Sequence, residues 1–217
     1  MISNMTELMN WVKPHVLWYD VPDAQAILRK VEYAGRECYR SHDKTTADSA
    51  EGFIRRAIAR GHESILEHVQ LTFKVVCSRD VLAQWTRHRM ASYSVESQRY
   101  CNYTKDKFAG FYFVMPEGFT SQMEAELLVA MEEDVEHYCR LIDMGAKPEQ
   151  ARAVLGNCTK TEFIWSANLR EIRHFLKLRT GVGAQPDIAR LARIIKKMME
   201  DAGLGVFVED VCIPEER

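Results

Sequence analysis

The sequence predicts an α+β fold in which a small sheet packs with long helices. Most of the chain shows helical periodicity, and the few β-rich segments are short, which disfavours a doubly wound parallel sheet. Hydrophobic residues make up 47% of the 217 residues, enough for a sizeable core. No repeat, low-complexity tract or Pro/Gly/Ser linker divides the sequence, so we expect a single domain over residues 1–217.

The predicted helices have apolar residues three and four positions apart and begin at capping residues or at proline. Asp23, Asp48 and Ser78 are candidate N-caps, and Pro148 stands where a helix would start. Between Ser121 and Met144, the apolar stripe is the clearest in the chain, and Gly145 can end it. We expect helices at residues 24–38, 48–60, 121–144, 148–155, 166–179 and 187–202, and another after Ser78 that turns Val81, Leu82 and Trp85 to the core.

The predicted strands are short and rich in β-branched or aromatic residues. In one of them Leu71, Phe73 and Val75 alternate with their neighbours, as in a strand with one buried face. Another segment is rich in aromatics and stops at Pro116. We expect strands at residues 16–19, 71–76, 108–115 and 206–208.

Charge and composition exclude several classes of protein. A net charge of -2 gives no global basic field for nucleic acid, and no apolar run approaches the roughly 20 residues of a membrane span. The segment Met1 to Asn10 has no basic region before an apolar stretch, so we expect no secretory signal. The six cysteines show no CxxC pair, which favours reduced thiols in a cytoplasmic protein.

The densest group of chemically useful residues lies between Arg87 and Tyr100. It contains three arginines, one histidine, three serines and two tyrosines. Arg87, Arg89 and Arg99 can offer planar, permanently charged forks to phosphate, and Ser97 can add a neutral donor. By density alone, this segment could equally be a solvated face or bind nucleic acid.

The order of these residues is more specific than their density. Arg-His-Arg at 87–89 is followed, after seven residues, by Ser97-Gln98-Arg99-Tyr100. This pattern resembles the active-site segment of the flavin-dependent thymidylate synthases. The similarity extends from about Ala34 to Gln185 through the segments Ala34-Gly35-Arg36-Glu37-Cys38-Tyr39, Gly61-His62-Glu63-Ser64-Ile65-Leu66-Glu67-His68, Gln84-Trp85, Ala151-Arg152, Trp165 to Arg179 and Ala184-Gln185.

The resemblance implies an enzyme that methylates dUMP reductively to dTMP. The family takes the carbon from 5,10-methylenetetrahydrofolate and the hydride from FAD that NADPH reduces, and it needs no protein nucleophile. The cofactor carries the redox chemistry, while the protein contributes positioning and electrostatics. The resemblance also implies a small, mostly antiparallel sheet and a homotetramer whose active sites lie between subunits.

For dUMP, the resemblance assigns residues from four segments. Arg179 matches the arginine beside the uracil ring, where a fixed positive charge would stabilise negative charge at N3 and O2 and make C5 more nucleophilic. We therefore assign the catalytic role to Arg179. The other implied dUMP contacts are Gln84, Trp85, Thr86, Arg87, Val95, Glu96, Ser97, Gln98, Arg99 and Arg152, the last from a neighbouring subunit.

For the flavin, the resemblance implies contacts before, within and after the Arg-His-Arg motif. His62 matches a histidine near the flavin ring, where it could order flavin or folate. The implied cofactor contacts are Ser64, Arg87, His88, Arg89, Val95, Asn168, Leu169, Arg170 and His174.

Several of these residues also have ordinary structural explanations. Arg152 could be a surface residue, Arg179 could simply favour a helix C-terminus, and Asn168 could serve only as a helix cap. His62 and His68 are six residues apart, unlike the i, i+4 pair of a zinc-binding helix, so we expect no metal site.

Two positions depart from the family pattern. Many members carry Asn-Glu or Ser-Gln where this chain has Ser94-Val95, so Val95 offers only its backbone to a ligand. The frequent His-Ala-Gln-Trp-Glu motif is replaced by Gly183-Ala184-Gln185-Pro186-Asp187, which removes one flavin contact. These changes bear on the affinity for flavin and folate more than on the class of reaction.

Two alternatives remain at this point. The same pocket could deliver hydroxymethyl instead of methyl to dUMP, or act on dCMP, since the sequence does not reveal how uracil and cytosine are told apart. The arginine-rich segment could instead be an RNA-binding patch on a protein without catalytic activity, although the net charge does not favour this.

Overall fold

The computed structural model describes residues 8–213. Within them the chain forms two compact units. Unit 1 contains the described residues up to His15, Val75–Thr86 and Ser94–Phe163, and unit 2 contains Val16–Lys74, Arg87–Tyr93 and the chain from Ile164 onward. The expectation that residues 1–217 form one domain stays a prediction.

The fold is α+β with a small, mostly antiparallel sheet, as expected. The four strands of this sheet lie in the order β2-β3-β6-β4. A second sheet consists of two parallel strands, in which Met9 pairs with Phe111 and Trp11 with Phe113. The strands are β1 (Met9–Trp11), β2 (His15–Trp18), β3 (Gln70–Ser78), β4 (Ala91–Val95), β5 (Phe111–Phe113) and β6 (Lys160–Asn168).

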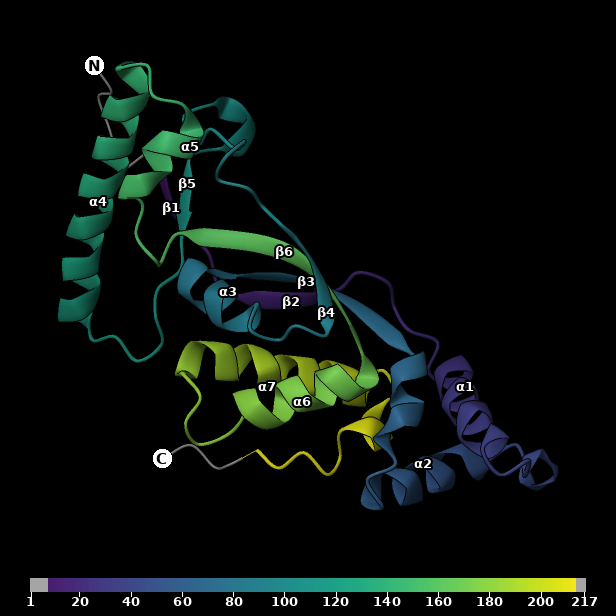
Figure 1. The fold of residues 1–217 in the computed structure, drawn as a ribbon. Helices are drawn as coiled ribbons and strands as arrows, with labels where there is room; N and C mark the ends of the chain where they lie inside the picture. The colour runs from purple at the N-terminus through teal and green to yellow at the C-terminus, as the bar shows by residue number, and fades with distance from the viewer. Residues whose placement is uncertain (1–7, 214–217) are drawn as a thin grey trace. The chain divides into compact units, whose positions relative to one another are not determined.

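Unit 1 is built around one long helix (Figure 1). Thr120 caps this helix through its hydroxyl, which accepts a hydrogen bond from the Met123 backbone at 3.4 Å. Buried aromatic and aliphatic side chains, among them Phe111, Val135 and Tyr138, pack together as the core of the unit. Its helices are α3 (Arg79–Trp85), α4 (Ser121–Asp143) and α5 (Pro148–Ala151), with 3-10 turns η4 (Asp106–Phe108) and η5 (Arg152–Val154).

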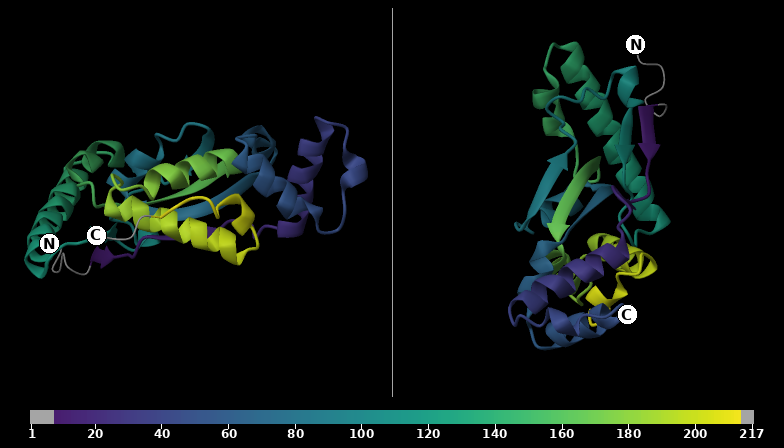
Figure 2. Two further views of the ribbon diagram at one scale, coloured as in Figure 1. Left: turned by 90° about the horizontal axis from the view of Figure 1, so that it is seen from below. Right: turned by 90° about the vertical axis from the view of Figure 1, so that its right-hand side faces the viewer.

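Unit 2 contains two pairs of neighbouring helices (Figures 1 and 2). α1 lies beside α2, and α6 lies beside α7. The rings of Phe73, Trp165 and Phe175 form a continuous aromatic core, with centroid distances of 5.7 and 5.0 Å. The elements are α1 (Ala24–Glu37), α2 (Ser49–Ala59), α6 (Leu169–Arg179), α7 (Pro186–Asp201) and the 3-10 turns η2 (His42–Lys44), η3 (Glu63–His68) and η6 (Gly205–Phe207).

Most of the predicted helices are confirmed, with ends shifted by a few residues. Asp23 caps α1 through its carboxylate, which accepts from the Ala26 backbone at 3.0 Å. Asp48 and Ser78 occupy N-cap positions as expected, but neither makes a side-chain capping bond. The helix predicted at 148–155 is shorter, because a 3-10 turn follows α5 after Ala151.

The main omission of the sequence prediction is strand β6. Every second residue of it is buried, namely Thr161, Phe163, Trp165 and Ala167, which is the pattern of a strand with one core face. The predicted helix 166–179 was therefore wrong in its first three residues, which belong to the strand. Strands β1 and β4 were also not predicted, and the expected strand 108–115 is reduced to Phe111–Phe113.

The strand expected at residues 206–208 is wrong. Phe207 N donates to Leu204 O, and Val208 N donates to Gly205 O, so these residues form a 3-10 turn. Val206 and Phe207 are apolar because the turn buries them, not because they belong to a sheet.

All six cysteines lie within the described residues and are free thiols. Among residues 8–213, none of the helices has both the length and the apolar character that a membrane span requires. The first seven positions of the segment Met1 to Asn10, which we do not expect to be a signal, lie outside the described residues.

Two glycines of unit 1 give a matched test of backbone geometry. Both have positive φ, +90° at Gly110 and +80° at Gly118, but a Cβ at Gly110 would lie 2.3 Å from the Leu8 carbonyl oxygen, whereas one at Gly118 meets nothing within 4 Å. Gly118→Ala should cost only the backbone strain, about 1 kcal/mol. Gly110→Ala should cost about 3 kcal/mol, because strand β1 must also shift. Urea unfolding of both variants measures the difference, and equal losses would contradict the close approach.

Candidate active site

Helix α6 presents one face to the Arg-His-Arg motif. Glu171, Phe175 and Arg179 recur every four residues, so they lie along one side of the helix. His88 lies over this stripe: its Nδ1 is 3.0 Å from Glu171 Oε1, its Nε2 is 3.1 Å from Arg179 Nε, and its ring meets the Phe175 ring edge-on at 4.9 Å. The stripe therefore holds His88 at three points.

His88 is buried and neutral. Only 4% of it is exposed, and desolvation lowers its pKa, with Arg179 and His174 acting in the same direction and Glu171 opposing them. The Tyr93 hydroxyl donates to the His88 backbone carbonyl at 2.7 Å, and burial raises the Tyr93 pKa to about 12. Desolvation also lowers the pKa of Arg179, although an arginine remains charged near neutral pH.

The N-terminal end of α6 borders a hollow of about 320 Å³. Asn168 caps the helix, its Oδ1 accepting from Glu171 N at 2.9 Å, which leaves the Nδ2 group as a donor. Arg170 pairs with Glu67 at 2.5 Å. The walls of this hollow are Glu63, Glu67, Met90, Asn168, Arg170, Glu171, His174 and Lys177.

Arg87 and Arg89 flank the buried His88 and are both exposed. Neither makes an ion pair or a hydrogen bond with another residue in the described part of the chain. Other arginines of unit 2 are paired: Arg55 with Glu209, and Arg170 with Glu67. Exposed guanidinium groups without such a partner are suited to the binding of an anion.

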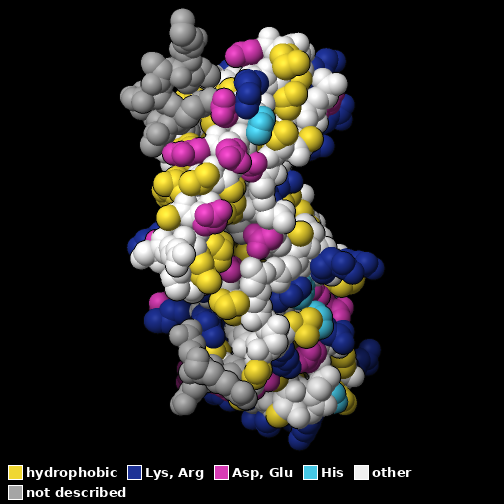
Figure 3. Space-filling view, turned by 90° about the vertical axis from the view of Figure 1, so that its left-hand side faces the viewer, with side chains coloured by type: hydrophobic (Ala, Val, Ile, Leu, Met, Phe, Trp, Pro, Cys, Tyr) yellow, Lys and Arg dark blue, Asp and Glu magenta, His cyan; other side chains and the backbone are white. Residues whose placement is uncertain are grey.

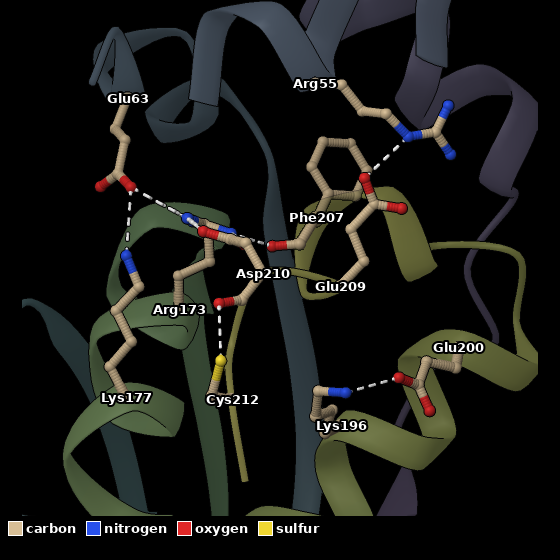
Figure 4. Close-up of polar contacts among 10 residues, drawn as sticks. All are labelled: Arg55, Glu63, Arg173, Lys177, Lys196, Glu200, Phe207, Glu209, Asp210 and Cys212. Carbon is tan, nitrogen blue, oxygen red and sulfur yellow. Dashed lines mark hydrogen bonds and ion pairs between the residues drawn. The ribbon is translucent and has the colours of Figure 1, made fainter. Parts of the chain in front are cut away.

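The opposite side of α6 is anchored by Arg173, of which only 1% is exposed (Figure 4). Its guanidinium donates to Glu63 Oε1 at 3.1 Å, to both carboxylate oxygens of Asp210 at 2.6 and 2.8 Å, and to the Phe207 carbonyl. Arg173 also holds the pKa of Asp210 below its usual value. Since Glu63 stands between His62 and Ser64, this network fixes the turn that carries both predicted flavin contacts.

In unit 1, the predicted phosphate-binding segment forms a tight turn. The Ser97 hydroxyl accepts from Arg99 N at 3.3 Å, and its carbonyl accepts from Tyr100 N and Cys101 N. Arg99 pairs with Glu149 at 2.8 Å, and Arg152 follows Glu149 by one helical turn. The contact of Arg152 with dUMP from a neighbouring subunit stays a prediction. Gln98 is buried, and its Nε2 has no hydrogen-bond partner. Because this nitrogen has almost no exposed surface, a ligand could not reach it in this arrangement.

Glu96 is already engaged within unit 1. Its carboxylate accepts from Lys160 Nζ at 2.7 Å and from the Tyr103 hydroxyl at 2.9 Å, beside a cavity of about 260 Å³. The backbone N of Glu96 donates to Glu162 O at 2.8 Å. Its carboxylate therefore has partners that compete with a nucleotide.

Several predicted contacts differ in their access to a ligand. Trp85 and Leu169 are fully buried, and Trp85 packs edge-on against Phe163 at 5.4 Å. Their side chains serve the core, so only their backbone could touch a ligand. His62, Ser64, Thr86 and His174 are exposed, and Gln84 and Val95 are partly exposed.

His88, Glu171 and His174 lie close enough together to suggest a metal site, with one candidate ligand atom from each within 4.8 Å of the others. Both ring nitrogens of His88 already have hydrogen-bond partners, and one of these is the cation Arg179. A metal ion would have to displace Glu171 or Arg179 from the imidazole. The geometry is better explained by hydrogen bonding than by metal ligation.

The matching family model supplies the decisive comparison. Residues 21–202 match the model described as thymidylate synthase complementing protein. The chain belongs to this family. The match covers most of the chain and includes both the Arg-His-Arg motif and all of α6.

Curated relatives of this family are flavin-dependent thymidylate synthases, so the predicted family and enzyme class are confirmed. The enzyme of Geobacter sulfurreducens is 37% identical over 202 residues, covering 85% of this chain and 84% of its own length. That of Pyrococcus furiosus is 35% identical over 174 residues, covering 79% of this chain and 70% of its own.

Solved structures share the fold. Thymidylate synthase X from Helicobacter pylori, crystallised with FAD and dUMP, has a TM-score of 0.74 at 23% identity, with 90% of this chain and 98% of that chain covered. A UMP/dUMP methylase from Streptomyces cacaoi, bound with 5-Br dUMP, has a TM-score of 0.78 at 25% identity, covering 94% and 100%.

Three residues around His88 are absent from the set that the sequence predicts. Glu171 and Tyr93 hold its side chain and backbone, and the exposed Met90 borders the hollow. Glu171 could have been found, because the spacing Glu171, Phe175, Arg179 places it on the same helix face as the predicted catalytic arginine.

The buried Arg173 and the exposed Arg55 form a matched pair for a stability test, since both bind carboxylates near the C-terminus (Figure 4). Arg173→Met should lower the free energy of unfolding by about 3 kcal/mol, because Asp210 and Glu63 lose the cation that neutralises them. Arg55→Met should change the melting temperature little, since solvent screens the exposed pair. Calorimetry of both variants is the measurement, and equal effects would contradict the anchoring role of Arg173.

Proposed function

We propose that this protein methylates dUMP reductively to dTMP, with methylenetetrahydrofolate as carbon donor and NADPH-reduced FAD as hydride source. The observation that carries the proposal is the set of residues that α6 gathers within unit 2: Asn168, Arg170 and His174 border the hollow, while Arg179 contacts His88 in the Arg-His-Arg motif. The family membership supports the same chemistry.

The residues around the hollow fit a flavin ring system. Its volume of about 320 Å³ is at the lower end of ligand pockets, which suits one planar ring system and not a whole dinucleotide. Asn168 Nδ2 and Arg170 can donate to the carbonyl and ring-nitrogen acceptors of a flavin, and Met90, 72% exposed, offers an apolar contact. Three glutamates in the walls disfavour phosphate there, so Arg87 and Arg89 are the better candidates for the diphosphate.

FAD, when bound, would supply the hydride, and the protein's own task is to hold and polarise the nucleotide. Arg179 carries a permanent positive charge in a partly desolvated position. A cation beside N3 and O2 of uracil stabilises negative charge at these atoms and so makes C5 more nucleophilic toward the carbon donor. The reaction then requires no nucleophilic side chain.

The nucleotide phosphate would be held by Ser97 and Arg99, together with Arg152 of a neighbouring subunit. Glu149 now neutralises Arg99 through an exposed pair, which a phosphate dianion can replace at small cost. We propose that the active protein is a homotetramer in which subunits share sites. Met123 and Val129 of α4 are exposed apolar side chains, and they support this assembly. Hydrophobic and acidic side chains are interspersed on the face that Figure 3 shows.

UMP is a second candidate substrate. The observation in its favour is the 25% identity to a UMP/dUMP methylase, with a TM-score of 0.78. Uracil offers the same N3 and O2 atoms to Arg179 in both nucleotides, so the assay must include both.

The absorption spectrum of the protein and the identity of its nucleotide product test the proposed function. Purified protein loaded with FAD should show a flavin spectrum that NADPH bleaches, and incubation with dUMP and methylenetetrahydrofolate should yield dTMP by mass spectrometry. Hydroxymethyl-dUMP as the end product, or methylation of UMP alone, would overturn the assignment of reaction or substrate. A protein that never retains FAD would contradict the flavin site.

Arg179→Ala should lower kcat for dTMP formation by roughly 10²–10³-fold, the usual loss when a preorganised electrostatic contact is removed. The FAD spectrum and the sedimentation coefficient should not change. Arg55→Ala is the matched control, because Arg55 lies on α2 in exposed pairs with Glu51 and Glu209. Near-normal turnover in Arg179→Ala would refute the catalytic role.

A further inference from the structure

We propose that Glu171 is a positioning residue, which orients the guanidinium of Arg179 through the imidazole of His88. The three groups form a chain from the first turn of α6 to its last: Glu171 Oε1 to His88 Nδ1 at 3.0 Å, and His88 Nε2 to Arg179 Nε at 3.1 Å. The inference deepens the proposed function, because it rests on Arg179 acting at the base of the nucleotide.

The direction of each hydrogen bond follows from the chemistry of the donors. Arg179 Nε–H can only donate, so His88 Nε2 must be the acceptor and carry no proton. A neutral imidazole then carries its proton on Nδ1, and this N–H donates to the Glu171 carboxylate. Glu171 therefore selects the one tautomer of His88 that can hold Arg179 in place.

Each member of the chain is itself held by its surroundings. Glu171 is mostly buried, and its backbone N donates to Asn168 Oδ1. The positive end of the α6 dipole favours the carboxylate of Glu171 in the first turn of the helix. The negative end favours the guanidinium of Arg179 in the last turn. His88 is fixed by Tyr93 at its backbone and by Phe175 at its ring. With so little freedom, the imidazole can transmit orientation from one end of the helix to the other.

The charged and titratable groups that face His88 are Glu171, His174, Arg179 and Tyr93. Burial, Arg179 and His174 lower the His88 pKa, whereas Glu171 raises it. Protonation would convert Nε2 into a donor facing another donor, and it would break the contact with Arg179. In acid, therefore, the support of Arg179 should be lost at a pH set by His88.

Two variants of Glu171 distinguish the role of its hydrogen-bond acceptor from the role of its negative charge. Glu171→Ala removes the acceptor, so both tautomers of His88 become accessible, and kcat should fall by about 10–100-fold, as when an orienting hydrogen-bond partner is lost. Glu171→Gln keeps an oxygen that accepts from Nδ1–H, and it should retain kcat within about fivefold at neutral pH, since a neutral hydrogen bond replaces a charge-assisted one. The KM for dUMP should change less than kcat, because Arg179 acts mainly on the nucleophilicity of C5 and less on the binding of the nucleotide.

The pH dependence of kcat distinguishes the positioning role from a general loss of stability, because lower folding stability alone would not shift its acid limb. Because the Glu171 carboxylate raises the pKa of His88, Glu171→Gln should lower that pKa, and the acid limb of kcat should move to lower pH. The His88 Cε1–H resonance, assigned by its absence in His88→Gln, should report the same shift without any turnover. Glu32→Gln is the matched control: Glu32 is a buried carboxylate of unit 2 that pairs with Arg36, so its loss should lower the melting temperature and leave the acid limb in place.

The outcomes separate this inference from the proposed function. If wild-type protein forms dTMP and Glu171→Ala matches it in kcat and pH profile, the positioning role is overturned. An unshifted His88 resonance in Glu171→Gln overturns it as well. If wild-type protein forms no dTMP while the His88 resonance shifts as expected, the proposed function fails and the Glu171–His88–Arg179 chain of hydrogen bonds stands.

Discussion

Helix α6 is constrained from two sides, and the proposed chemistry depends on both constraints. On one side Arg173 is buried among Glu63, Asp210 and the Phe207 carbonyl; on the other, His88 is clamped between Glu171 and Arg179. If this buried guanidinium moved, its two carboxylate partners would lose the positive charge that balances them. The protein's own contacts thus hold the helix in place, which is what electrostatic preorganisation requires.

The same helix carries residues for both ligands of the proposed reaction, the flavin and the nucleotide. Its N-terminal end, with Asn168 and Arg170, borders a hollow that suits a flavin ring, and its last residue, Arg179, is the cation that we assign to the nucleotide base. Arg87 and Arg89 remain exposed without partners among the described residues, whereas His88 between them is buried. We therefore propose that the Arg-His-Arg motif combines two groups that bind an anion with one structural group.

Local sequence patterns predicted most of the helices, because their apolar stripes and caps are local properties. They failed at β6, where the alternation of Thr161, Phe163 and Trp165 runs directly into the helical period of α6, and at residues 206–208, where burial in a turn resembles a strand. For the site, the resemblance identified the Arg-His-Arg motif. It did not reveal that the side chains of Trp85 and Leu169 are buried in the core and cannot contact a ligand. Arg173 was not predicted, because its partners are more than 30 residues away in the sequence. Glu171 was not predicted either, although its spacing from Arg179 on α6 is a local signal.

A crystal structure of the protein with both FAD and dUMP would test the central claim most directly. The account predicts that the flavin ring lies within hydrogen-bonding distance of Asn168 and Arg170, and that the Arg179 guanidinium faces O2 and N3 of the uracil with its Nε still donating to His88. Well-defined ligands bound away from α6, or an Arg179 that turns from the base when both are present, would contradict it.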